Sequence, residues 1–163
     1  MPSGSVNIYN FRDQEIIIEP SCDTSALSTN DIIATTELVD LQTVSSNKQT
    51  RAGRITGIQI LDKDDQGQDI EVFFLKDDTS LGTENSGVSI SDADAEKIIG
   101  SVTVSEWSNG IGWQLGQSFP IEMPFVTGTD NSNQLGVAFV CRGGTPTYTA
   151  SGLYVRIFAQ LQE

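Results

Sequence analysis

Short runs of β-branched and apolar residues recur along this chain, and polar turn residues separate one run from the next. Successive side chains of a strand point to opposite faces, so an alternation such as Ile58-Gln59-Ile60 indicates a strand with one buried side. Many short strands punctuated by Gly, Asn and Pro predict an all-β fold, either a β-sandwich or a jelly-roll-like domain. The predicted strands are residues 6–11, 14–19, 32–39, 54–61, 69–75, 101–105, 112–115, 119–126, 135–142 and 153–161.

Two local patterns are more specific. The polar residues 62–68 separate two regular apolar runs and predict a hairpin between strands 54–61 and 69–75. Residues 91–98 predict one short helix, with Ser91 as N-cap, Asp94 in the capping-box position and Gly100 at its end. About two turns fit there, so we expect a connector that packs on a sheet edge.

The chain has 163 residues, which suits one domain with a real core. Residues 31–163 predict the β-sandwich, and residues 1–30 predict an N-terminal arm or edge strands. Residues 6–19 fit either an extended arm that pairs with a neighbouring chain or an edge strand of their own domain. The interface candidates in this segment are Val6, Ile8, Tyr9, Phe11, Ile16 and Ile18.

The charge balance disfavours several partners. Lys and Arg number 9 against 22 Asp and Glu, which gives a net charge of −13. Such a surface repels phosphate backbones and anionic lipids, so we expect no direct nucleic-acid binding and no membrane binding. No apolar run is long enough to cross a bilayer, and the first residues lack the pattern of a secretory signal. Cys22 and Cys141 then predict free thiols in a reducing cytosol.

The residue inventory argues against an enzyme. The chain has no histidine, which removes the commonest general base and excludes Ser-His-Asp and Cys-His arrangements. The sequence also lacks a Walker phosphate loop and the dinucleotide-binding glycine pattern. A carboxylate pair for glycoside hydrolysis stays open, but two neighbouring acids among 22 carry little information. We expect a non-enzymatic protein without a cofactor.

One segment resembles part of a metal loop. Asp62 and Asp64 alternate ahead of Gly67, as carboxylates do in the first half of a calcium loop. Phe73 stands where an EF-hand supplies its bidentate glutamate, and no helices flank the loop. A solvated turn explains the same residues. We therefore predict no metal, with Asp62 and Asp64 as the residues to examine.

Three aromatic residues have two interpretations. Trp107, Trp113 and Tyr148 lie in or beside predicted loops, where an exposed ring would stack on a sugar or anchor an interface. Packing in the core is the more common explanation of such residues. Trp113 and Tyr148 are kept as interface candidates.

Three stretches together resemble a known family of proteins. They are Ile58–Gly67 (IQILDKDDQG), Ser86–Ala95 (SGVSISDADA) and Arg142–Leu153 (RGGTPTYTASGL). In order and surroundings they resemble small virion proteins of tailed bacteriophages, of the head decoration or cement type, over residues 31–161. These motifs are structural turns, so the resemblance carries over no functional residues.

The resemblance implies a β-rich protein that binds the outside of a capsid and stabilises the contacts between capsid subunits. It implies the major capsid protein as partner, a dimer or trimer of this chain, and a place on the virion surface after folding in the host cytoplasm. A tail, collar or fibre component is the alternative within the particle. A carbohydrate-binding β-sandwich that uses Trp107, Trp113 or Tyr148 is the alternative of another class.

Overall fold

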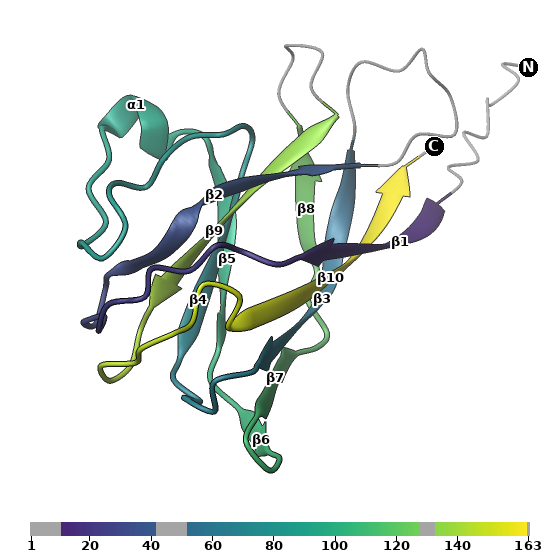
Figure 1. The fold of residues 1–163 in the computed structure, drawn as a ribbon. Coiled ribbons are helices and arrows are strands. Elements are labelled where there is room, and N and C mark those ends of the chain that lie inside the picture. Colours follow the sequence, from purple (N-terminus) through teal and green to yellow (C-terminus); the bar gives the residue numbers. More distant parts are fainter. Residues whose placement is uncertain (1–10, 42–51, 128–132, 163) are drawn as a thin grey trace, which may run out of the picture.

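The computed structural model describes residues 11–41, 52–127 and 133–162. Two antiparallel sheets pack against each other, which confirms the predicted all-β sandwich (Figure 1). The elements in chain order are β1 (Phe11–Ile18), β2 (Ile32–Asp40), β3 (Ala52–Asp62), β4 (Ile70–Leu75), α1 (Asp92–Ala95), β5 (Ile98–Val104), β6 (Trp107–Asn109), β7 (Gln114–Ser118), β8 (Met123–Val126), β9 (Gln134–Cys141) and β10 (Leu153–Gln162).

The larger sheet has six strands in the order β1-β10-β3-β7-β6, with β8 also paired to β3. Both β7 and β8 fit on β3 because that strand is 11 residues long. Its first residues pair with β8, and Ile58–Asp62 pair with β7. The smaller sheet has four strands in the order β2-β9-β4-β5.

The core lies between the two sheets and follows the alternation of the strands. In β10 the residues Leu153, Val155 and Ile157 are buried, whereas their neighbours Tyr154 and Arg156 point outward. Burying one face of each strand in this way gives the main favourable free energy of a sandwich.

The outer faces of the two sheets differ. Strand β9 is buried on both sides: Val137 and Phe139 face the central core, while Ala138 and Val140 join a second cluster with Leu81. The segment after β4, which contains α1, therefore covers the smaller sheet, and α1 lies beside that sheet in Figure 1. No described segment covers the six-stranded sheet in this way.

The predicted hairpin between residues 54–61 and 69–75 is wrong. Strand β3 pairs with β10, β7 and β8, whereas β4 pairs with β9 and β5, so the two strands belong to different sheets. Both strands send apolar side chains into the same core, and the loop of residues 63–69 crosses from one sheet to the other. Alternating patterns identify strands, but they do not tell a hairpin from an arch between sheets.

The predicted helix is correct at its start and too long at its end. Ser91 is the N-cap and its Oγ accepts the Asp94 backbone N–H at 3.2 Å. The helix ends after Ala95, because Ile98–Gly100 pair with β4 as the first residues of β5. Gly100 is thus a strand residue opposite Phe74 and does not end the helix.

The described part of the N-terminal segment joins this sandwich. Strand β1 pairs along its whole length with β10 of the same chain. Leu27, which follows it, belongs to the same core cluster as Ile16 and Ile18. Among the described residues, no helix has the length and apolar character needed to cross a membrane.

Candidate functional site

The interface candidates of the N-terminal segment fall into three groups. Val6, Ile8 and Tyr9 lie outside the described residues. Phe11 pairs with Gln162 at the start of β1, and only its backbone is described.

Ile16 and Ile18 are core residues in this fold and not surface contacts, which corrects their interpretation as interface residues. The reason is register: β1 adds to β10, and its even-numbered apolar side chains point into the sandwich. Ile17 points the other way and is 52% exposed.

Of the three singled-out aromatics, Tyr148 is buried and Trp107 is half-buried. Tyr148 is 1% exposed, so it cannot contact a ligand at the surface. Its hydroxyl has no hydrogen-bond partner among the described residues, and burial raises the pKa of the phenol. Trp107 packs against the central core. Trp113 is 43% exposed and remains a surface candidate.

The carboxylates of Asp62 and Asp64 stabilise loops by accepting hydrogen bonds. Asp62 is fully buried, and its carboxylate accepts the backbone N–H groups of Asp64, Gln66 and Gly67 at 2.8–2.9 Å. Asp64 accepts the backbone N–H of Thr149 at 2.7 Å and the Thr149 hydroxyl. Both carboxylates thus satisfy donors of the crossover loops. Nowhere in the described residues do three or more His, Cys, Asp or Glu side chains gather as a metal site.

Cys22 and Cys141 are buried free thiols. Desolvation raises the pKa of Cys22 from 9.0 to about 12, and burial raises the pKa of Cys141 as well. Reactivity belongs to the thiolate, so neither group is an activated nucleophile near neutral pH.

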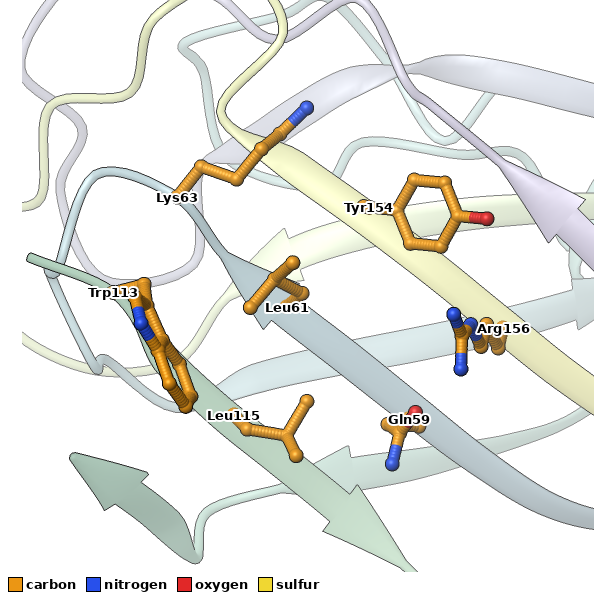
Figure 2. Close-up of a pocket in the computed structure, with 7 residues that line it drawn as sticks. All are labelled: Gln59, Leu61, Lys63, Trp113, Leu115, Tyr154 and Arg156. Atoms are coloured by element: carbon orange, nitrogen blue, oxygen red, sulfur yellow. The ribbon is translucent and has the colours of Figure 1, made fainter. Parts of the chain in front are cut away.

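The outer face of the six-stranded sheet, which no described segment covers, carries an open groove of about 670 Å³. Tyr154, Leu61 and Leu115 stand side by side on β10, β3 and β7, as the strand registers require. Figure 2 shows Trp113 on one side of the groove and Tyr154 with Arg156 on the other, with the two leucines between them. The lining residues are Gln59, Leu61, Lys63, Trp113, Leu115, Tyr154 and Arg156.

The β6–β7 hairpin positions Trp113. The Gly110 N–H donates to the Trp113 carbonyl at 2.8 Å, and Gly112 adopts a positive φ of 75° that suits glycine. The indole ring lies directly against Gly110, since a Cβ at that position would fall 2.1 Å from its Cε2 atom. A residue with a side chain at position 110 would push the ring away. The hairpin therefore fixes the orientation of the ring.

Two cations line the groove, each in an exposed ion pair. Arg156 Nε lies 3.5 Å from the Glu15 carboxylate, and Lys63 Nζ lies 3.6 Å from the Glu19 carboxylate. The Arg156 guanidinium also lies over the Tyr154 ring, 5.5 Å from its centroid. All four charged side chains are well exposed, so these pairs are weak and readily exchanged.

A second feature of the same face is an aromatic pair, which we call the Phe119 patch and define as Phe119 and Phe158. The two ring centroids are 5.5 Å apart, and Phe119 is 51% exposed. Gly57 lies beneath the pair, because a Cβ there would fall 1.8 Å from the Phe119 ring. The patch borders a hollow of about 440 Å³ that Asp13 and Glu15 also line.

Sequence reasoning missed Tyr154, Arg156, Phe119 and Phe158. The alternation of residues 153–161 contained part of the signal, because it places Tyr154, Arg156 and Phe158 on one face. It did not reveal that this face is uncovered.

No protein-family model matches this sequence, and no curated protein matches it. Among solved structures, the chain is similar to the one reported as "The Structure of Tomato Aspermy Virus by X-Ray Crystallography". The similarity has a TM-score of 0.43 and 8% sequence identity, and it covers 95% of this chain and 78% of that chain. A similarity this weak assigns neither a family nor a function to the chain.

Proposed function

We propose that this chain is a non-enzymatic structural protein of a virus particle, which binds the outside of a phage capsid and stabilises contacts between capsid subunits. The resemblance of residues 31–161 to phage head decoration proteins supports this role. The structural observation that carries it is the Phe119 patch on the uncovered face of the six-stranded sheet.

The patch has the features of a protein-binding surface. Interfaces combine an apolar centre, often aromatic, with a polar or charged rim. Phe119 and Phe158 supply such a centre, and the carboxylates of Asp13 and Glu15 supply an acidic rim. With a net charge of −13, the chain is complementary to a basic surface with an apolar pocket. The major capsid protein is the proposed owner of that surface.

Mass action accounts for the stabilisation. A protein that buries area on two adjacent capsid subunits, but not on separated ones, shifts the equilibrium toward the closed shell. Assembly of this chain as a dimer or trimer would add further attachment points, so modest single contacts suffice. Its place is then the capsid surface, after folding in the host cytoplasm.

The first test is the copy number of this chain in purified particles, measured by quantitative mass spectrometry. A number comparable to that of the major capsid protein supports decoration of the shell. A handful of copies per particle assigns the chain to the tail, collar or fibre instead. Its absence from particles rejects a virion role.

The second test addresses the Phe119 patch. Phe119→Ala should lower the amount of this protein that co-sediments with capsids prepared without it, because the substitution removes an exposed aromatic anchor. Val126→Ala is the matched control, since Val126 is a similarly exposed apolar residue at 53% and lies on β8. Equal capsid binding by the two variants would reject the patch as the docking site.

A further inference from the structure

The groove described above is separate from the Phe119 patch and has a different chemistry. Arg156, Gln59 and Gln117 are paired across three adjacent strands. These polar residues lie between the leucines of the groove and the two phenylalanines of the patch. We propose that this groove binds a short saccharide that carries a carboxylate, such as a uronate or sialylated glycan.

The aromatic side chains supply the stacking surface. A pyranose presents C–H groups on one face, which are attracted to the negative face of an aromatic ring. Trp113 is held against Gly110 in a fixed orientation and is 43% exposed at one side of the groove. Tyr154 stands on the opposite side (Figure 2). Leu61 and Leu115 form the apolar floor between the two rings.

The size of the groove suits a small ligand. It spans three adjacent strands, β10, β3 and β7, whose neighbouring axes lie about 4.8 Å apart. The groove is thus about 10 Å wide between its outer strands, which fits a few sugar rings and not a folded domain. A volume of about 670 Å³ also lies in the range of small-ligand sites.

The two positively charged side chains in the groove favour a saccharide that carries a carboxylate. Although the chain has only 9 Lys and Arg residues, Lys63 and Arg156 both line this groove. Their ion pairs with Glu19 and Glu15 are 3.5–3.6 Å long and exposed, so a ligand carboxylate can replace either protein carboxylate. Arg binds carboxylates through paired N–H donors. The Gln59 amide and the Tyr154 hydroxyl offer further donors and acceptors for sugar hydroxyls.

The experiment uses the full chain and calorimetric titration. The probes are a panel of oligogalacturonates and sialylated oligosaccharides, each paired with its methyl ester, which removes the charge and keeps the ring. We expect at least one acidic member to bind about tenfold more tightly than its ester. Failure of every member to bind at millimolar concentration would overturn the proposal, and equal affinity for acids and esters would overturn it too.

Variants assign the binding to the groove. Trp113→Ala should weaken binding of the acidic probe about tenfold, whereas Ile111→Ala, a fully exposed neighbour in the same hairpin, should leave it unchanged. Arg156→Gln should reduce the difference in affinity between acid and ester, because only Lys63 then remains as a cation in the groove, and the exposed position of Arg156 keeps the fold intact. If Trp113→Ala binds the acid like Ile111→Ala does, the groove is not the site.

Capsid binding separates this proposal from the previous one. Trp113→Ala should bind capsids like the unchanged protein, and Phe119→Ala should bind the saccharide like the unchanged protein. Loss of capsid binding in Trp113→Ala would mean that the capsid protein occupies the groove, which contradicts the saccharide proposal.

Discussion

At the scale of single residues, buried polar groups decide what a position can do. Asp62 has the residue type of a calcium ligand, yet its two oxygens accept three backbone N–H groups of the loop that follows β3. Buried donors without a partner are costly, so the carboxylate is needed where it is. Its role is to shape the crossover between the sheets.

We expect Asp62→Asn to lower the free energy of unfolding by about 2–3 kcal/mol, because the amide nitrogen cannot accept the N–H groups that one carboxylate oxygen accepted. Asp65→Asn is the control, since Asp65 is exposed and asparagine tolerates its φ of 57°. Urea denaturation of both variants measures the difference. Equal stabilities would contradict the structural role of Asp62.

The buried thiol of Cys22 predicts how stability depends on pH. Its folded pKa is about 12, above the unfolded value near 9.0, so the folded state holds a proton that the unfolded state loses. This contribution is fully present below about pH 9 and falls as the pH rises toward 12, by up to about 1.4 kcal/mol per pH unit. Cys22→Ala should flatten this loss between pH 9 and about 11, measured by urea denaturation under reducing conditions. If the free energy of unfolding of Cys22→Ala falls with pH as steeply as that of the unchanged protein, the Cys22 thiol is not the cause of the loss.

At the scale of elements, each strand is defined by what lies on its two sides. Strand β9 is buried on both faces from Leu135 to Cys141, and this stretch contains no polar side chain. Strand β10 has one uncovered face, and it alternates instead. Strand β1 stands at the edge of the six-stranded sheet, where the sequence left open a choice between an arm and an edge strand.

Two neighbouring isoleucines in β1 test whether this strand belongs to its own domain or pairs with a neighbouring chain. Ile16→Ala should lower the free energy of unfolding by about 2–4 kcal/mol, because Ile16 is buried in the core of its own chain. Ile17→Ala should change it by less than about 0.5 kcal/mol, because Ile17 points to solvent. The two variants are compared at several protein concentrations. If the loss in free energy of unfolding caused by Ile16→Ala depends on protein concentration, β1 pairs with a neighbouring chain.

At the scale of the whole molecule, acidic residues far outnumber basic ones. The net charge of −13 makes the folded chain repel itself, and salt screens this repulsion. We expect the melting temperature to rise by a few degrees between about 0.02 and 0.5 M NaCl. An equal osmolality of sucrose controls for solute effects unrelated to charge. A melting temperature that falls with NaCl would show that attractive ion pairs outweigh the repulsion.

Much of this architecture follows from the sequence by itself. The strand pattern, the all-β class and the N-cap at Ser91 depend on residues close together in the chain, where alternation and capping act directly. The absence of histidine excluded the commonest catalytic arrangements in the same way.

Only the tertiary structure decided which strands share a sheet and which faces are covered. The arch between β3 and β4, the burial of Tyr148 and the half-buried position of Tyr154 in the groove depend on segments far apart in the chain. Local alternation states that Tyr154 and Arg156 share a face, but coverage of that face depends on where other segments pack. The sequence therefore determined most of the strands and the start of the helix, whereas the packing of distant elements created the groove and the Phe119 patch.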